Sequence, residues 1–586
     1  MLTYEILIIA PLFFALVILR TKLFLRDILS IVFVVILIVI TINHFVSYIG
    51  YSYITFSDYF HNIFILLDAI VLLYFLWQGI AKKHNLVIIF SLVQIVLYGF
   101  VLSLTPTITS NDILVDNISS VMYLIINIVG GIIIIFALKY IESEQFSRFK
   151  KNSFIAILFF FLAVMNFIVS TNNIEIFFLL FELTTLCSYI LISYRADEIS
   201  IKNGLQALWM NQIGGVAILI ALIFSITHYE TIYFDKLISN IDGTYLLPIV
   251  LLSIAAFVKG ASIPFDKWLL GAMVAPTPVS AILHSATMVK IAPFLMLKLS
   301  LAMNDFVSIT ITLIGSFVFV TASALALSKD YFKEILGLST IALLGLMMSL
   351  AVIGTQESIT ACLILIVFHA IAKAMLFLQA GILEKMMHLK YLDDINGLVN
   401  HSPLVVFFII VGFASLTLPP FGGFIGKFMA IESISTMIVQ NPIYTLSLVF
   451  VALGSVFLTL LYFKVVTKLF AYDVDKEPKQ YIHISKFYTI PSFILVCFLF
   501  FGIYVSFGNG FLSIVEIIVP FLIIAIVPIL FATLIFKKAH RVKEYSCGEK
   551  DNLKLSAYYF DIPDSYKKSI TVIAIVSLVI LIVGVI

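Results

Sequence analysis

The chain has 586 residues, of which 62% are hydrophobic and only 12% are charged, with a net charge of +2. Charged residues make up about a quarter of an ordinary soluble domain, so this chain has roughly half the usual share. A soluble protein of this length would form several domains, and each would need a polar surface that this composition does not supply. The composition therefore excludes a soluble enzyme, a nucleic-acid-binding protein, a disordered protein and a disulfide scaffold.

Hydrophobic runs separated by short polar breaks predict about 18 membrane crossings, because a crossing helix needs about 20 mostly apolar residues. In chain order the runs lie near 2–20, 26–48, 61–80, 85–104, 117–141, 152–170, 172–194, 203–228, 245–277, 278–300, 305–328, 335–355, 358–384, 402–438, 442–470, 487–508, 511–537 and 568–586. The predicted fold class is therefore an all-α polytopic membrane protein.

Lysine and arginine gather in alternate loops. Arg20 and Lys22 follow the first run, and Lys82 and Lys83 follow the third. Loops after even-numbered runs are nearly free of both residue types, with Lys236 as the main exception. Cytoplasmic loops of membrane proteins carry the excess of basic residues. We therefore expect a multi-pass protein of the inner (cytoplasmic) membrane with both termini outside.

Two runs are too long for one straight crossing, and each is interrupted by proline and glycine. The run 245–277 is broken at 260–264, and the run 402–438 at 419–423. Proline removes a backbone donor and glycine frees the backbone, so both favour a break in a helix. Paired breaks in two halves of a chain are typical of inverted-repeat transporters, in which broken helices line the ion path. The alternative is two ordinary proline kinks.

Several ionisable residues fall near the middle of predicted crossings or beside the two breaks. They are Glu182, Lys259, Lys290, Lys373 and Lys427, with His284 and His369 on the same helices as two of the lysines. A charge at the bilayer centre costs about 2.5–3.5 kcal/mol on insertion scales. Lysines about 15 Å from either interface cannot reach water by snorkelling. We therefore expect these groups to face the protein interior.

Burial favours the neutral form of an amine, whereas a nearby carboxylate favours the charged form. A buried lysine near a carboxylate can thus accept and release a proton as its neighbour changes. Lysines, histidines and water at this depth are typical of a proton relay. No nucleophile–base pair accompanies them, so a hydrolytic site is not expected.

Other ionisable residues have simpler interpretations. Lys298, Lys464 and Lys468 lie close to helix ends, where snorkelling explains them. Asp68 can serve as a polar contact between helices, and His284 can be either a packing residue or a relay residue. The role of Asp68 is left open by the sequence.

The chain carries no signature of a cofactor. Its four cysteines, Cys187, Cys362, Cys497 and Cys547, lie far apart without a Cys-x-x-Cys pair. This spacing excludes an iron–sulfur cluster, a structural zinc site or a thiol-bound nickel site built from these cysteines alone. A glycine-rich phosphate loop is also missing. We therefore expect no cofactor, no metal and no catalytic residue in this chain.

Four motifs resemble a known family. They are Phe181-Glu182-Leu183-Thr184-Thr185, the stretch from Lys259 through Pro264 and Trp268 to His284, His369-Ala370-Ile371-Ala372-Lys373, and Gly423-Phe424-Ile425-Gly426-Lys427. From about Asp116 to Lys468, the chain resembles the antiporter-like proton-translocating subunits of respiratory complex I, Mrp sodium/proton antiporters and membrane-bound nickel–iron hydrogenases. Thr184-Thr185-Leu186-Cys187 and Ala207-Leu208-Trp209-Met210-Asn211 most resemble the hydrogenase branch.

The resemblance implies a role for each relay residue. Glu182 and Lys259 would form a paired gate, Lys290 assisted by His284 would pass the proton on, Lys373 with His369 beside it would be the central link, and Lys427 would be the terminal lysine. It also implies three regions. These are N-terminal hairpins at 1–110, a core at 111–470 with inverted repeats at about 152–300 and 305–470, and C-terminal helices at 471–586 with a polar cytoplasmic loop at about 538–567.

The sequence departs from the family pattern in three places. Gly214-Gly215 stands about where the long subunit of complex I carries an acidic residue. Four crossings precede the helix of Asp116 where the family usually shows two, which leaves one hairpin unassigned. Beyond 537, a polar stretch of about 30 residues precedes only one more crossing, so a long lateral helix is not expected. Within that stretch, Glu544–Glu549 either docks a cytoplasmic partner or is a solvated loop.

The expected function is proton translocation in a multi-subunit redox complex. The resemblance implies an energy-converting nickel–iron hydrogenase, coupled to electron transfer in partner subunits. The alternatives are a subunit of an Mrp-type sodium/proton antiporter and the long membrane subunit of an NADH:quinone oxidoreductase. The expected partners are other membrane subunits, a peripheral redox arm, the lipid bilayer and protons, with sodium as the alternative ion and no nucleic acid.

Overall fold

The computed structural model describes residues 3–47, 52–241, 245–470, 484–508 and 561–585. Within these ranges, fourteen helices are long and apolar enough to cross a membrane, and α1, α4 and α11 are shorter apolar helices. This confirms a polytopic all-α membrane protein. The predicted crossing at 511–537, most of the loop at 538–567 and the stretch Glu544–Glu549 lie outside the described residues, and a count of eighteen crossings stays a prediction.

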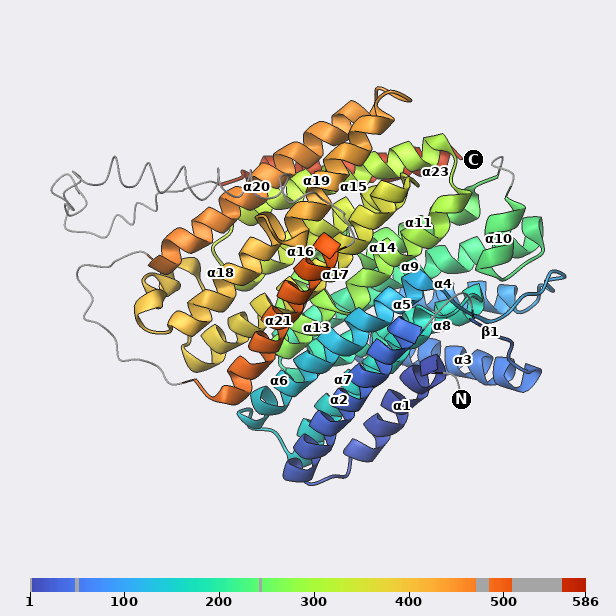
Figure 1. Ribbon diagram of the computed structural model, residues 1–586. Helices are drawn as coiled ribbons and strands as arrows, with labels where there is room; N and C mark the ends of the chain where they lie inside the picture. The colour runs from blue at the N-terminus through green and yellow to red at the C-terminus, as the bar shows by residue number, and fades with distance from the viewer. Residues whose placement is uncertain (1–2, 48–51, 242–244, 471–483, 509–560, 586) are drawn as a thin grey trace.

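The N-terminal helices pack at one end of the bundle (Figure 1). They are α1 (Thr3–Ile18), α2 (Leu23–Ser47), α3 (Asp58–Ala81) and α4 (Asn85–Val101). Strands β1 (Ser52–Ile54) and β2 (Ile113–Val115) pair antiparallel, with Ser52 opposite Val115. In the chain, β1 lies between α2 and α3, and β2 lies just before α5. The amide of Leu114 in β2 donates to the carbonyl of Ser170, just after α7.

The next helices form the first half of the predicted core. They are α5 (Asn117–Leu124), a π-helical turn (Ile125–Val129), α6 (Gly130–Glu142), α7 (Arg148–Ile168), α8 (Ile174–Ile192), α9 (Glu198–Tyr229), α10 (Phe234–Asn240), α11 (Leu247–Lys259), α12 (Lys267–Gly271), α13 (Thr277–Ser285) and α14 (Ile291–Leu299). Side chains of residues before the helices cap several of them. Asn173 accepts hydrogen bonds from the first turn of α8, and Asp197 does so for α9.

The remaining helices complete the bundle. They are α15 (Asp305–Leu327), α16 (Phe332–Ala351), α17 (Gln356–Met386), α18 (Pro403–Thr417), α19 (Gly422–Met437), α20 (Tyr444–Phe470), α21 (Lys486–Gly508) and α23 (Asp564–Val583). The polar turns between the hydrophobic runs end these helices within a few residues of the predicted boundaries.

Both predicted helix breaks are present. Helix α11 ends at Lys259 and α12 begins at Lys267, with a cis peptide bond before Pro264. Helix α18 ends at Thr417 and α19 begins at Gly422, with a cis bond between Pro419 and Pro420. The chain thus leaves the helical path where glycine and proline are concentrated, as the sequence predicts.

A third break was not predicted. The run 278–300 was expected to be one helix, but α13 ends at Ser285 and α14 begins at Ile291. The hydroxyls of Ser285 and Thr287 donate hydrogen bonds to the carbonyls of Ala281 and Ile282. Such side-chain bonds compete with the helix's own hydrogen bonds. Pro293, in the first turn of α14, has no N–H for the carbonyl four residues before it and also favours the break.

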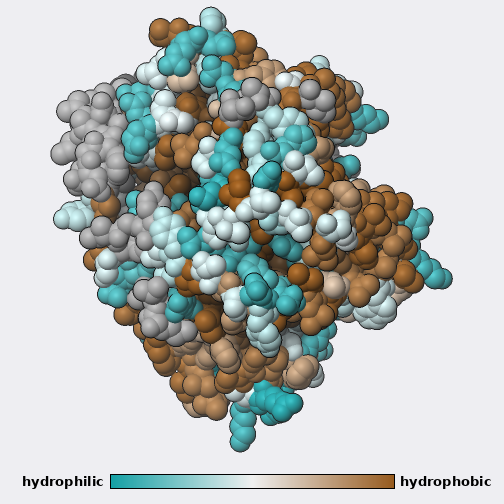
Figure 2. Space-filling model, turned by 90° about the vertical axis from the view of Figure 1, so that its right-hand side faces the viewer, coloured by the Kyte–Doolittle hydropathy of each residue, from teal (hydrophilic) through white to brown (hydrophobic). Residues whose placement is uncertain are grey.

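Helices α13, α14, α16 and α17, which carry or contact several predicted relay residues, lie in the interior. Residues of α13, α14, α16 and α17 are almost all buried, whereas α2, α20 and α23 expose most of their apolar side chains. Figure 2 shows wide brown areas of such exposed hydrophobic side chains on one face of the molecule. The outer helices therefore present apolar surface to lipid and separate the central helices from it.

Helices α15 and α16 approach closely through two glycines. A Cβ atom at Gly345 would lie 2.7 Å from the carbonyl oxygen of Gly315, which is backbone and cannot move aside as a side chain can. A Cβ atom at Gly99 in α4 would meet nothing within 4 Å.

We therefore expect Gly345→Ala to force α15 and α16 apart and to lower stability by about 1–3 kcal/mol. Gly99→Ala is the control and should be neutral or slightly stabilising. The check is the thermal unfolding midpoint of the full chain extracted in detergent. Equal midpoints for the two variants would show that this close approach is not needed.

Candidate functional site

All seven predicted relay residues lie in the interior of the protein. Their exposed fractions are 0% for Glu182, Lys259, His284, Lys290 and Lys373, 1% for His369 and 4% for Lys427. None of the five charged side chains therefore reaches the surface of this chain. The prediction that these groups face the protein interior is confirmed by their burial.

Glu182 on α8 is held by a side chain from the unassigned hairpin. The amide of Gln94 on α4 donates to its Oε1 at 2.8 Å and also donates to the carbonyl of Gln212 on α9 at 3.2 Å. Its Oε2 has no hydrogen-bond partner within the described ranges. A Cβ atom at Gly215 would lie 1.9 Å from Oε1. The glycine therefore leaves the space in which Gln94 and Glu182 meet.

Lys259 docks on the same turn of α8. Its ammonium donates to the carbonyl of Phe181 at 3.0 Å and to the hydroxyl of Thr185 at 2.8 Å. It also lies 3.8 Å from the centre of the Phe181 ring. The nitrogen forms no ion pair with Glu182 within 4 Å, so Lys259 and Glu182 are neighbours on one helical turn rather than a closed pair.

The helix break places the Lys259 ammonium. Lys259 is the last residue of α11, where the helix dipole favours a positive charge. The indole nitrogen of Trp268 donates to the carbonyl of Val258 at 2.9 Å, and this hydrogen bond joins α12 to the end of α11. The break thus holds the lysine at a helix end in the interior of the bundle.

Lys290 meets a histidine from the second half of the predicted core. Its amine lies 2.8 Å from Nδ1 of His369 on α17 and 3.8 Å from the sulfur of Met347. Lys290 also stands directly before α14, at the end where a helix disfavours a cation. The resemblance assigned His284 as its helper and placed His369 beside Lys373. The structure pairs Lys290 with His369 instead.

His284 and Lys373 have other neighbours. His284 lies on α13 before the third break, its ring is 4.7 Å from that of Phe377, and neither ring nitrogen is hydrogen-bonded among the described residues. The amine of Lys373 donates to the carbonyl of Leu336 at 3.0 Å and to the hydroxyl of Ser339 at 2.5 Å. Lys373 therefore joins α17 to α16.

Lys427 lies in the second turn of α19, just after the other break. Its side chain is almost fully buried, and the described part of the chain offers its amine no hydrogen bond. Gly423 permits this arrangement, because a Cβ atom there would lie 2.3 Å from the carbonyl oxygen of Ser415 on α18. The second break therefore brings α18 and α19 into contact beside the terminal lysine.

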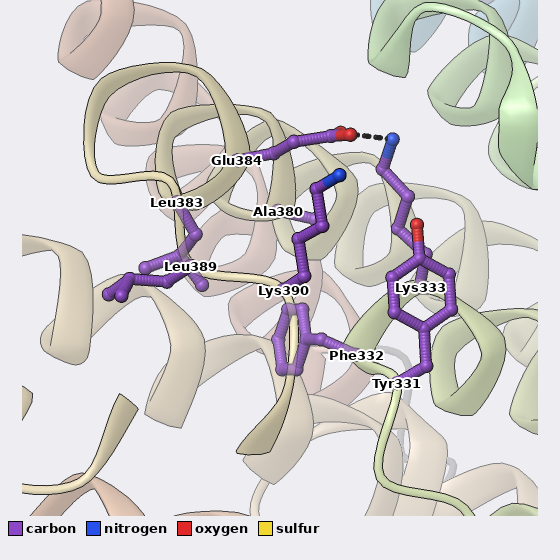
Figure 3. Close-up of a pocket in the computed structure, with 8 residues that line it drawn as sticks. All are labelled: Tyr331, Phe332, Lys333, Ala380, Leu383, Glu384, Leu389 and Lys390. Carbon is purple, nitrogen blue, oxygen red and sulfur yellow. Dashed lines mark ion pairs between the residues drawn. The ribbon is translucent and has the colours of Figure 1, made fainter. Parts of the chain in front are cut away.

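An ion pair near the end of α17 was missed from the sequence. Glu384 pairs with Lys333 on α16 (Figure 3). It also accepts a hydrogen bond from the hydroxyl of Thr277 at 3.2 Å. The pair lines a pocket with Tyr331, Phe332, Ala380, Leu383, Leu389 and Lys390. In the sequence, Lys333 is one of the basic residues between the runs 305–328 and 335–355. Glu384 follows Lys373 by three helical turns, so α17 connects this pocket to the relay lysine.

Several polar partners of the relay residues are uncharged. Gln94, Gln212 and Ser339 are not found by a search for charges in apolar runs, and Thr185 appears in the sequence only as part of the motif that begins at Phe181. Gln94, in the middle of the apolar run 85–104, is the clearest sign in the sequence that α4 contacts a polar group. Among the described residues, no group of three or more His, Cys, Asp or Glu side chains is placed to hold a metal ion.

Comparison with sequence families gives two matches. Residues 171–459 match the family described as "NADH:quinone oxidoreductase/Mrp antiporter, TM". Residues 108–150 match "NADH-Ubiquinone oxidoreductase (complex I), chain 5 N-terminus". The two matches cover nearly the same stretch as the resemblance expected from the motifs.

Relatives among curated proteins are antiporter subunits. The chain is 31% identical over 423 residues to "Putative antiporter subunit mnhA2" of Staphylococcus haemolyticus, covering 67% of this chain and 52% of the relative. It is 30% identical over 373 residues to "Na(+)/H(+) antiporter subunit A1" of the same organism, covering 59% of this chain and 46% of the relative. The chain thus spans about half the length of these relatives.

A solved structure supports the fold. The chain resembles a subunit of the "membrane-bound sulfane sulfur reductase (MBS), an archaeal respiratory membrane complex", with a TM-score of 0.62 and 19% identity. The match covers 77% of this chain and 95% of the other. The names of the curated relatives favour the Mrp alternative over the hydrogenase interpretation. The chain belongs to the family of antiporter-like membrane subunits shared by NADH:quinone oxidoreductases and Mrp antiporters.

Proposed function

We propose that the chain is the proton-translocating subunit of an Mrp-type sodium/proton antiporter complex. The relay runs from Glu182 and Lys259 through Lys290 and His369 to Lys373 and Lys427. The curated relatives support the complex, and the buried amines support the ion path. The contact of 2.8 Å between Lys290 and His369 carries the proposal, because it joins residues of the two predicted repeats at a distance that permits proton transfer.

The relay needs no redox centre in this chain. A proton on one amine disfavours a proton on the next, so loading Lys259 would lower the affinity of Lys290 for its own proton. Exchange of sodium for protons would then be coupled by charge. One elementary charge moved through 100 mV takes about 2.3 kcal/mol, a modest energy beside interactions between buried charges.

The proposal includes a topology. The basic loops lie in the cytoplasm, the opposite helix ends lie outside, and the complex sits in the cytoplasmic membrane with other membrane subunits. The pocket between Lys333 and Glu384 then opens on the cytoplasmic side, near the end of α17.

Replacing Lys290 by methionine should abolish the transfer between the halves. We expect antiport in vesicles of the full complex to fall below about a tenth of the wild-type rate, as for the loss of a positioned proton carrier. Lys567→Met is the control, because Lys567 lies on the outer helix α23 with a partly exposed side chain. Wild-type antiport with Lys290→Met would contradict the relay.

A methyl group at Gly215 should separate Gln94 from Glu182. We expect Gly215→Ala to insert normally into the membrane but to lose most of its antiport, since the carboxylate must leave its hydrogen bond. The comparison is with Gly99→Ala, measured by antiport rate per unit of inserted chain. Full antiport by Gly215→Ala would show that the Glu182 position is not critical.

The topology can be checked by cysteine labelling in a chain without its native cysteines. We expect a membrane-impermeant maleimide added to intact cells to label Thr105→Cys and to leave Lys82→Cys unlabelled until the cells are broken. Both positions are exposed in the structure. Labelling of Lys82→Cys in intact cells would reverse the proposed orientation.

A further inference from the structure

The hairpin of α3 and α4 has a polar side that faces the core. Gln78 accepts a hydrogen bond from the hydroxyl of Tyr189 on α8 at 2.9 Å, and Ser91 accepts one from Gln212 on α9 at 2.8 Å. The opposite side of the hairpin is apolar and exposed, with Leu66, Ile70, Leu73, Trp77 and Val96 among its residues. The hairpin therefore lies between the lipid and the helix that carries Glu182.

Most of these polar side chains simply join helices, but Asp68 does not. It is 1% exposed, and the hydroxyl of Tyr98 lies near enough to contact its carboxyl without making a hydrogen bond of good geometry to either oxygen within the described ranges. A buried carboxyl that only joined two helices would have a hydrogen-bond partner, because an unsatisfied one costs stability. Asp68 therefore calls for another explanation.

The titratable groups that interact with Asp68 are acidic or phenolic. It interacts electrostatically with Glu175, Glu182 and the hydroxyl of Tyr98. The Tyr98 hydroxyl donates to Oε1 of Glu175 at 3.1 Å. Glu175 and Glu182 lie on one side of α8, seven residues or about 10 Å apart along the helix axis. The cluster therefore contains three carboxyls and one hydroxyl.

Few positive charges face this cluster. His61 on α3 lies near Glu175 but pairs with Asp112 at 3.4 Å, and Lys259 is bound to α8 on the inner side of Glu182. Interacting carboxylates in a buried setting disfavour one another's charge, which favours a proton or a cation on at least one of them. Asp68, Glu175 and Glu182 do not converge as a metal-holding group among the described residues, which favours the proton.

The cluster extends from Glu182 toward the face of the protein opposite the basic loops. Glu175 is in the first turn of α8 and Tyr98 in the last turn of α4, and both helix ends lie opposite the basic loops. Asp68 lies ten residues into α3, deeper than either. The order from that face inward is thus Glu175, Tyr98, Asp68 and Glu182.

We propose that Asp68, Tyr98 and Glu175 form a proton-loading site that supplies Glu182 from the face opposite the basic loops. The inference rests on the proposed relay, because Glu182 must pass the proton on. The protonated Asp68 carboxyl gives its proton to the Glu182 carboxylate and becomes a carboxylate. Tyr98 then gives its hydroxyl proton to Asp68 and takes one from protonated Glu175, which is reloaded from the solvent.

The test uses right-side-out vesicles of the full complex, in which the pH of the medium sets the proton supply at this face. We expect Asp68→Asn to lower antiport at least about tenfold at neutral pH and to remove its dependence on medium pH. Asp68→Glu should restore both the rate and the pH dependence. Glu357→Gln is the matched control, because Glu357 lies in the first turn of α17 and is exposed.

The outcomes separate this inference from the proposed function. Normal amounts of inserted Asp68→Asn with a wild-type pH profile would overturn the loading site, and so would a change in sodium dependence alone. Loss of antiport in Glu182→Gln together with normal Asp68→Asn would leave the relay intact without this site. Normal antiport in both Glu182→Gln and Lys290→Met would instead contradict the relay itself.

Discussion

The cost of a charge in hydrocarbon is the constraint on which this structure depends. Each lysine at the bilayer centre opposes insertion by about 2.5–3.5 kcal/mol unless the protein supplies polar partners. Neighbouring helices supply such partners to Lys259, Lys290 and Lys373, whereas Lys427 has no hydrogen bond among the described residues. Lys259 donates hydrogen bonds to a backbone carbonyl and a hydroxyl of α8, and Lys373 donates to a carbonyl and a hydroxyl of α16. Lys290 contacts a ring nitrogen of His369. Apolar helices outside them exclude lipid.

Helix breaks are the means by which the bundle meets this constraint. In a regular helix the backbone carbonyls accept hydrogen bonds from the same helix, and the side chains project from its sides. At the ends of α11 and before α14 and α19, the backbone leaves the helix and a lysine stands at or near the end. The breaks thus bring Lys259, Lys290 and Lys427 into the interior, and close contacts at Gly215 and Gly423 keep the neighbouring helices near them.

The sequence predicts the positions of the charges better than their partners. Hydrophobic runs, basic loops and proline–glycine clusters are local signals, so the crossings and two breaks could be read directly. The break before α14 involves the hydroxyls of Ser285 and Thr287 together with Pro293, and none of these alone marks a break inside an apolar run. The partner of His369 could not be found from spacing along α17, because it comes from another helix. Gln94 was missed for the same reason.

A high-resolution experimental map of the intact complex in a lipid bilayer would test the central claim most directly. A relay of buried amines requires water between groups too far apart for direct transfer, since protons move along hydrogen bonds. The account predicts ordered water that links Lys259 to Lys290 and Lys373 to Lys427. Dry apolar packing in both gaps, with no water in any transport state, would contradict it.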